Sequence, residues 1–195
     1  HLENQLQKIE SQICDVHTFV HLAWLGTNDW NSSVHKNINT QLSEYLIKRL
    51  SSGGIEHVIV AGTCLEYGVS GGNLSEILPV KPKNEYALAK YALYESIRIM
   101  ANKDGFELSW LRLFYIFGGD QPSTTIYGSM MEHIIRGKTK FNMSSGQQVR
   151  DYLHIDTVCQ MILAVVMSKQ GFDVVNICSG QGLTLEKHVR GWLHD

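Results

Sequence analysis

The sequence predicts an α/β fold built around a parallel sheet. Two short apolar runs rich in β-branched residues, 18–22 and 57–61, have the length and composition of buried parallel strands. Between and after them lie segments with apolar residues at three- and four-residue intervals, which is typical of helices, and the clearest of these is 85–100. This alternation of strands and helices favours a parallel sheet covered by helices.

The composition is that of an ordinary globular protein. Of the 195 residues, 44% are hydrophobic and 18% charged, and the formal net charge is -2. A charge this close to zero does not support nucleic-acid binding or attachment to an acidic membrane surface. No apolar run approaches the roughly 20 residues of a membrane span. We therefore expect neither nucleic acid nor membrane as a partner.

Cysteine and histidine occur without the spacing of a metal site or a disulfide framework. The four cysteines are scattered and form no Cys-x-x-Cys pair, which favours reduced thiols and a cytoplasmic location. The nine histidines do not cluster with cysteines or carboxylates, so we predict no metal site.

The first third of the chain is expected to alternate helix, strand and helix. An apolar stripe at helical spacing precedes the strand at 18–22 and is interpreted as core packing; it consists of Leu2, Leu6, Ile9 and Ile13. The polar segment 31–39 leads into a helix over 42–50, which Ser51-Ser-Gly-Gly54 closes.

The rest of the chain follows the same alternation. A loop over 68–82, rich in Gly, Ser and Asn, suits a mobile edge of a substrate site. The helix that begins at Glu85 is expected to end before Gly105. The remaining expected elements are a strand over 108–117, helices over 127–136 and 157–168, a strand over 174–178 that returns to the sheet, and a helix from 183.

Tyr86 and Lys90 lie four residues apart on the helix 85–100, so both side chains project from one face. A nearby ammonium favours the phenolate and lowers the pKa of a tyrosine, so the pair can relay a proton, although this spacing also arises by chance. Thr63 follows the strand 57–61, and ligands bind at the carboxyl ends of strands in open α/β sheets. We therefore expect Thr63 to meet Tyr86 and Lys90.

This arrangement resembles the Ser/Thr-Tyr-Lys site of the extended short-chain dehydrogenase/reductases, the NAD-dependent epimerase/dehydratase family that modifies nucleotide sugars. Further motifs match in the family's order and cover nearly the whole chain. They are His21-Leu22-Ala23-Trp24, Asn37, Tyr67-Gly68, Leu111-Arg-Leu-Phe-Tyr-Ile-Phe-Gly118 and Arg150-Asp-Tyr-Leu-His-Ile-Asp156.

The resemblance implies a Rossmann-type, doubly wound parallel sheet with a small carboxyl-terminal substrate lobe. We expect 1–120 to form the NAD(P)-binding domain and 121–195 mainly the substrate-binding lobe, with 171–180 returning to the sheet. The family's glycine-rich turn is absent from this sequence. We therefore expect the amino-terminal βαβ unit to be missing and the carboxyl end to be cut short.

The resemblance also assigns roles to residues. It implies that Thr63, Tyr86 and Lys90 are catalytic and that the cofactor is NAD or NADP. The residues that it places at the cofactor are Leu22, Ala23, Trp24 and Phe114, together with Tyr86 and Lys90.

At the nucleotide-diphosphate sugar, the resemblance places Asn37, Tyr115 and Arg150. A guanidinium suits a diphosphate because it offers paired donors; a salt bridge with Asp151 or Asp156 is the alternative for Arg150. A helix cap is the alternative for Asn37. Tyr115 departs from an asparagine common at its position.

The residues after Thr63 narrow the chemistry. Family dehydratases carry an acidic pair there, and this chain has Cys64 and Leu65, which disfavours dehydration. The acid/base cysteine of 3,5-epimerases lies two positions after the hydroxyl residue, so we interpret Cys64 as an inert thiol. The reaction that remains among those of the family is hydride transfer at a ring carbon, with Tyr86 as acid or base.

Several phrases, among them Gly62-Thr-Cys-Leu-Glu-Tyr-Gly68, most resemble the abequose-type reductases of nucleotide-linked 4-keto-6-deoxyhexoses in bacterial O-antigen and lipopolysaccharide biosynthesis. We expect that activity. An NAD-dependent 4-epimerase and a non-catalytic sugar-nucleotide-binding relative are the alternatives. Because many relatives pair through the catalytic helix and its predecessor, we expect a homodimer.

Overall fold

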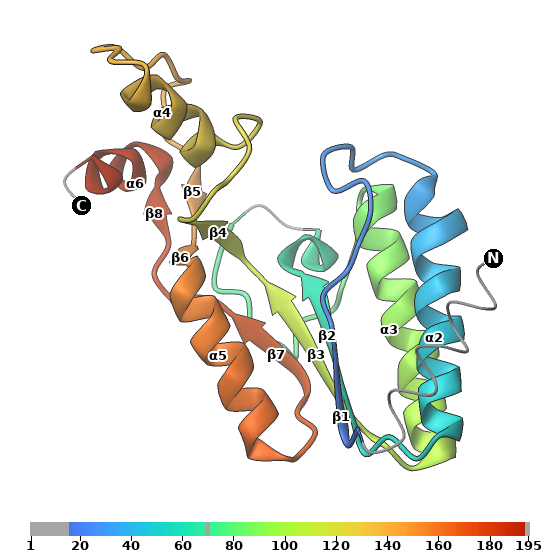
Figure 1. Ribbon diagram of the computed structural model, residues 1–195. Helices are drawn as coiled ribbons and strands as arrows, with labels where there is room; N and C mark the ends of the chain where they lie inside the picture. The colour runs from blue at the N-terminus through green and yellow to red at the C-terminus, as the bar shows by residue number, and fades with distance from the viewer. Residues whose placement is uncertain (1–15, 69–70, 194–195) are drawn as a thin grey trace. The chain divides into compact units, whose positions relative to one another are not determined.

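The computed structural model describes residues 16–68 and 71–193, which form two compact units (Figure 1). The first unit contains the described residues up to Arg112 together with Val165–Asn176, and the second contains Leu113–Ala164 and the residues from Ile177 onward. The apolar stripe expected between Leu2 and Ile13 lies outside the described residues.

A four-stranded sheet organises the first unit. Its strand order is β1-β2-β3-β7, and its strands are β1 (Thr18–His21), β2 (His57–Thr63), β3 (Glu107–Leu113) and β7 (Asp173–Ile177). Strands β1 and β2 run parallel, with Thr18 opposite His57. Every residue of β2 is buried, as its continuous apolar sequence requires of a central parallel strand. The predicted α/β fold with a parallel sheet is confirmed. Strand β7, in the region expected to return to the sheet, lies beside β3.

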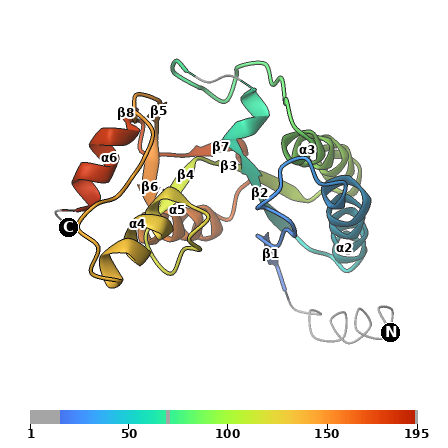
Figure 2. The ribbon, with the colours of Figure 1, turned by 90° about the horizontal axis from the view of Figure 1, so that it is seen from above.

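Two helices lie side by side against this sheet (Figures 1 and 2). The first, α2 (Gln41–Ser52), continues a π-helical segment, η1 (His35–Thr40), and the second is α3 (Glu85–Asp104). The Asn84 Oδ1 atom caps α3 by accepting a hydrogen bond from the Ala87 N–H at 2.8 Å. Gly105 ends the helix in the left-handed conformation, φ 82°, as glycine commonly does. Helix and sheet meet in a core that includes Ile47, Val58, Val60, Leu93, Ile97 and Trp110.

The second unit contains two small sheets and three helices. Strand β4 (Tyr115–Phe117) pairs in parallel with β6 (Tyr152–His154), and β5 (Val149–Arg150) pairs in antiparallel fashion with β8 (Leu183–Thr184). The helices are α4 (Ile126–Ile135), α5 (Ile155–Ser168), whose residues from Val165 onward belong to the first unit, and α6 (Leu185–Trp192). Its core includes a cluster of Met130, Leu185, Val189 and Trp192.

The strand predicted over 108–117 is divided in two. Strand β3 ends at Leu113 and β4 begins at Tyr115, because the hydrogen-bond partners of the backbone change between them. The Phe114 N–H donates to the Ile177 carbonyl, whereas the Tyr115 N–H donates to the Asp151 carbonyl. The sequence of an apolar run does not show that its two halves pair with strands of two different sheets.

No helix within residues 16–68 and 71–193 is both long and apolar enough to cross a membrane. The same part of the chain holds no group of three or more His, Cys, Asp or Glu side chains placed to ligate a metal ion.

Candidate active site

Strand β2 extends two residues beyond the predicted range 57–61, so Thr63 is its last residue and does not follow it. Thr63 also begins a short 3-10 turn, η2 (Cys64–Tyr67), and is only 6% exposed. The Thr63 Oγ1 atom accepts a hydrogen bond from the Leu65 N–H, and the Thr63 N–H donates to Glu66 Oε1 at 2.8 Å. This reciprocal capping holds the threonine hydroxyl at the carboxyl end of a buried strand.

The structure brings Tyr86 to Thr63. The two side chains share a hydrogen bond. Tyr86 lies in the first turn of α3, and its backbone N–H donates to the Trp30 carbonyl at 2.9 Å, which ties the start of the helix to the loop that follows β1. Two hydroxyl groups from separate segments therefore meet at one point.

Lys90 is buried on the same helix, with 2% exposure. Its Nζ atom donates to the Ala61 carbonyl at 2.6 Å, lies 3.8 Å from the centroid of the Trp24 ring and is 6.0 Å from the centroid of the Tyr86 ring. Burial lowers the pKa of Lys90 to about 7, although the negative charge of Glu66 opposes this shift. Near neutral pH the amine is therefore divided between its charged and neutral forms.

The pKa of Tyr86 differs from the prediction that Lys90 lowers it. Burial raises the pKa of Tyr86 to about 12, and the hydrogen bond with Thr63 only partly opposes this shift. Because Lys90 itself titrates near neutrality, it is a weak source of positive charge for the phenol. The phenol therefore stays protonated at neutral pH.

An aromatic cluster that the sequence did not reveal surrounds this pair. The Trp24 Nε1–H donates to His35 Nδ1 at 3.0 Å, and His35 Nε2 lies 2.8 Å from the Asp29 carbonyl, which requires the neutral ring protonated at Nε2. The Tyr86 ring meets the Trp24 and His35 rings edge-on, at centroid distances of 6.2 Å and 5.3 Å. His35 is fully buried, yet nothing in its sequence context distinguishes it from the other histidines.

Three further predicted residues of the first unit lie outside this cluster. Leu22 and Ala23 are exposed beyond β1, and Asn37 is exposed within η1. Asn37 does not cap the helix, since Val34 precedes η1 without a side-chain cap. The asparagine with a structural role is Asn39, whose side chain accepts from the Leu25 N–H and donates to the Leu25 carbonyl.

The other predicted ligands belong to the second unit. Phe114, Tyr115 and Arg150 are all half-buried there. The Arg150 guanidinium carbon lies 5.3 Å from the centroid of the Tyr115 ring, and Nη1 donates to the Val149 carbonyl at 2.7 Å. Within the described residues Arg150 forms no ion pair with Asp151 or Asp156.

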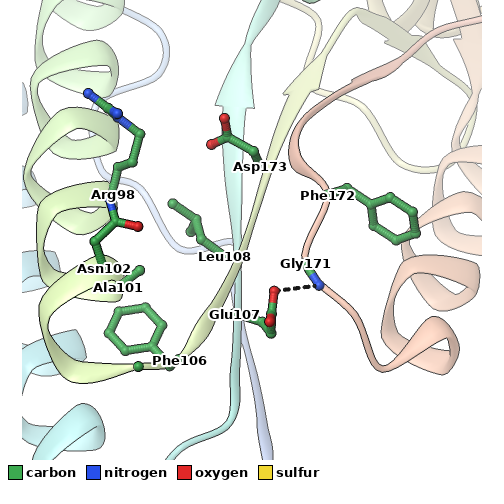
Figure 3. Close-up of a pocket in the computed structure, with 10 residues that line it drawn as sticks. Arg98, Ala101, Asn102, Phe106, Glu107, Leu108, Gly171, Phe172 and Asp173 are labelled. Atoms are coloured by element: carbon green, nitrogen blue, oxygen red, sulfur yellow. Dashed lines mark hydrogen bonds between the residues drawn. The ribbon is translucent and has the colours of Figure 1, made fainter.

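A surface groove of about 650 Å³ lies in the first unit at the amino ends of β3 and β7 and the last turns of α3 (Figure 3). Arg98 and Asp173 lie on opposite sides of it, and the Gly171 N–H donates to Glu107 Oε2 at its base. None of the predicted site residues lines this groove. The candidate site is therefore the Thr63, Tyr86 and Lys90 cluster at the other ends of the strands.

A buried histidine beside Lys90 predicts acid sensitivity. His21 is 8% exposed, and its Nε2 atom lies 2.7 Å from Ser43 Oγ. Burial, and then the charge of Lys90, lower the pKa of His21 from 6.5 to about 4. Between these values the unfolded chain binds a proton that the folded chain does not, so the free energy of unfolding falls as the pH falls, by up to about 3 kcal/mol.

Urea unfolding at several pH values measures this loss. The variant His21→Gln replaces the imidazole with an uncharged amide that can still bond Ser43. We expect the free energy of unfolding of this variant to lose much of its pH dependence between pH 6.5 and about 4. If the free energy of unfolding of that variant changed with pH as steeply as in the wild-type protein, the assignment to His21 would be contradicted.

Comparison with known proteins agrees with this geometry. The model of the NAD dependent epimerase/dehydratase family matches residues 2–178. The chain belongs to this family. The predicted cofactor, NAD or NADP, is confirmed at the level of the family, which is NAD dependent, and solved relatives are bound with NAD.

Among curated proteins, the chain is similar to a dTDP-6-deoxy-L-talose 4-dehydrogenase (NAD(+)) of Aggregatibacter actinomycetemcomitans. The two are 26% identical over 192 residues, which are 98% of this chain and 69% of that protein. A GDP-6-deoxy-D-talose 4-dehydrogenase of the same organism is 22% identical over 151 residues, 76% of this chain and 51% of that protein.

Among solved structures, a dTDP-glucose 4,6-dehydratase of Streptomyces venezuelae matches with a TM-score of 0.83 at 22% identity, over 97% of this chain and 60% of that one. A UDP-glucuronic acid 4-epimerase of Bacillus cereus matches with a TM-score of 0.81 at 18% identity, over 95% of this chain and 61% of that one. These likenesses support the Rossmann-type fold. The chain spans about 60% of the length of these two structures.

The residues of the described site suit one end of such a cofactor. An ammonium is a donor of three hydrogen bonds, and the Lys90 amine, held by the Ala61 carbonyl, suits the hydroxyl groups of a ribose. The Thr63 and Tyr86 hydroxyls beside it suit a carbonyl oxygen. The sequence holds no glycine-rich turn to bind a pyrophosphate.

Proposed function

We propose that the protein is an NAD(P)-dependent oxidoreductase that reduces the ketone of a nucleotide-linked 4-keto-6-deoxyhexose. The observation that carries this proposal is the hydrogen bond between Thr63 and Tyr86 beside the buried amine of Lys90. The similarity to two 6-deoxytalose 4-dehydrogenases supports the choice of a 4-keto-6-deoxy sugar. The absence of acidic side chains at Cys64 and Leu65 disfavours a dehydratase.

Each residue has a separate task in this reaction. Tyr86, with a pKa of about 12, remains protonated and donates its proton to the ketone oxygen as negative charge develops there. Thr63 hydrogen-bonds the same oxygen, and the charged form of Lys90 stabilises the phenolate that Tyr86 leaves. The nicotinamide, when bound, supplies the hydride to the carbonyl carbon. We place Trp24 and Phe114 at the cofactor, and Tyr115 and Arg150 at the nucleotide sugar.

An assay of the full-length gene product tests this function. We expect dTDP- or CDP-4-keto-6-deoxyhexose to cause oxidation of NADH or NADPH, measured by the loss of its absorbance. If folded protein oxidised neither coenzyme with either sugar nucleotide, the proposed reductase activity would be contradicted. Comparing the two coenzymes also determines which one the protein prefers.

A 4-epimerase is the second candidate. A UDP-glucose 4-epimerase of Lactobacillus helveticus is 25% identical over 158 residues, and the same proton relay serves hydride removal and return. Purified protein that contains tightly bound NAD and converts a sugar nucleotide without added coenzyme would favour this activity. Binding of a sugar nucleotide without turnover would favour the non-catalytic alternative.

We also propose a homodimer that forms through α2 and α3. Both helices expose apolar side chains: Leu42 and Tyr45 on α2, and Leu88 and Ile99 on α3, with Ile99 64% exposed. Exposed apolar patches of this kind mark interaction sites. We expect light scattering to give twice the mass of the chain, and the variant Leu88→Glu to give a monomer. A monomeric wild-type protein at assay concentrations would contradict the dimer.

A further inference from the structure

A fully buried carboxylate lies behind the candidate site. Glu66 has 0% exposure, and its two oxygens accept hydrogen bonds from three donors. The Oε1 atom accepts from the Thr63 N–H at 2.8 Å and the Trp110 Nε1–H at 3.0 Å, and Oε2 accepts from the Arg112 Nε–H at 2.8 Å. A buried carboxylate is stable only when it is paired and hydrogen-bonded in this way.

The geometry shows that Glu66 does not itself exchange protons with a ligand. Its carboxylate is enclosed between β2 and β3, and the close approach depends on Gly62, where a Cβ atom would collide with the Trp110 indole and lie 2.8 Å from Glu66 Oε1. Arg112, 3% exposed, is its ion-pair partner. Burial raises the pKa of the Glu66 carboxyl, and the hydrogen bond and charge of Arg112, with the hydrogen bonds from Thr63 and Trp110, oppose that rise. Because both oxygens accept hydrogen bonds and Arg112 is the ion-pair partner, we treat Glu66 as a negative charge held against the last residue of β2.

The surroundings of Arg112 make this charge rigid. The Arg112 guanidinium carbon lies 4.6 Å from the centroid of the Tyr67 ring, and the Tyr67 hydroxyl donates to Asn176 Oδ1 at 2.8 Å. The Asn176 side chain in turn donates to the Leu74 carbonyl. The network thus also reaches Leu74 of the 71–82 loop.

The charge of Glu66 acts on both groups of the proton relay. It raises the pKa of Lys90 and that of Tyr86, which both lie on α3. The other ionisable groups that face this region are Arg112 from β3, which pairs with Glu66, His21 from β1, which burial keeps neutral, and the Cys64 thiol of η2, which also raises the pKa of Tyr86.

We propose that Glu66 is a positioning residue of the reductase: it fixes Thr63 through the backbone N–H and places a buried negative charge at the end of β2, the strand whose Ala61 carbonyl holds the Lys90 amine. This inference rests on the proposed function for its consequence in catalysis. Its electrostatic part concerns the ionisation of Lys90 and is measurable without substrate or cofactor.

The test is an NMR titration of the lysine ε-carbons in full-length protein labelled with ¹³C-lysine. The Lys90 signal is assigned by its loss in Lys90→Met. In the wild-type protein we expect this signal to titrate near 7, and in Glu66→Gln, which keeps the size and an acceptor for Thr63, at lower pH. The matched control Glu107→Gln removes an exposed carboxylate at the start of β3 and should leave the Lys90 titration unchanged.

A second variant covers the case in which Glu66→Gln does not fold because Arg112 is left unpaired. Glu66→Gln/Arg112→Met removes both buried charges, a replacement that proteins often tolerate, and we again expect Lys90 to titrate at lower pH. An unshifted Lys90 titration in either folded variant would overturn the inference.

Kinetics separate this inference from the proposed function. If the protein is the reductase, Glu66→Gln should lower kcat about 10- to 100-fold with little change in KM, because a smaller fraction of Lys90 is then charged to stabilise the Tyr86 phenolate. The alkaline limb of its pH profile should also move to lower pH, whereas a purely structural role would lower the rate equally at every pH. If no sugar nucleotide is reduced, the proposed function fails, while the NMR titration still decides the role of Glu66.

Discussion

The substitution Tyr86→Phe is expected to lower kcat for ketone reduction about 100- to 10,000-fold, the contribution typical of a positioned proton donor. The phenyl ring keeps the edge-on contacts with Trp24 and His35, so the fold and the binding of the cofactor should be retained. Only the proton and the hydrogen bond to Thr63 are removed. Steady-state rates and coenzyme dissociation constants, measured on the same preparations, test both parts.

The control is Tyr91→Phe, which removes a phenol from the same helix outside the Thr63 cluster. We expect it to retain near wild-type activity. Full activity in Tyr86→Phe would exclude Tyr86 as the proton donor, and equal losses in both variants would indicate damage to the helix.

The substitution Lys90→Met is expected to separate activity from stability. Without the amine, turnover should fall about 100-fold or more, because the phenolate left after proton transfer loses its nearest cation. Stability near neutral pH should rise or stay unchanged, because Met fills the same buried space without a charge to desolvate. Lys90 is 2% exposed, so this cost falls on the wild-type protein.

The pH dependence of unfolding tests the same substitution. Burial lowers the pKa of Lys90 from 10.5 to about 7. Between these values the unfolded wild-type chain holds a proton that the folded chain has lost, so stability should rise with pH, by up to about 5 kcal/mol. Lys90→Met should lack this rise, and Lys48→Met, which removes an exposed lysine of α2, should keep it. A rise that persists in Lys90→Met would contradict the assignment.

Local pattern was sufficient for much of this protein. The apolar run at 57–61, the capped helix from Glu85 to Gly105 and the four-residue spacing of Tyr86 and Lys90 predicted a parallel sheet and a face that carries a phenol and an amine. These features depend on residues close together in the chain, so the sequence displays them directly. The order of the motifs was sufficient to indicate the family, which the match over 2–178 shows.

The electrostatic state of the site was decided only by the tertiary structure. Whether a lysine lowers the pKa of a nearby tyrosine depends on how far each side chain is removed from water. Burial among β2, α3 and the Trp24 side chain brings the pKa of Lys90 to about 7 and that of Tyr86 to about 12. The roles of His35, Asn39 and Glu66 are likewise formed by long-range contacts. Residue type and spacing do not encode desolvation or contacts between distant segments, so the sequence named the reacting groups and the fold determined their charges.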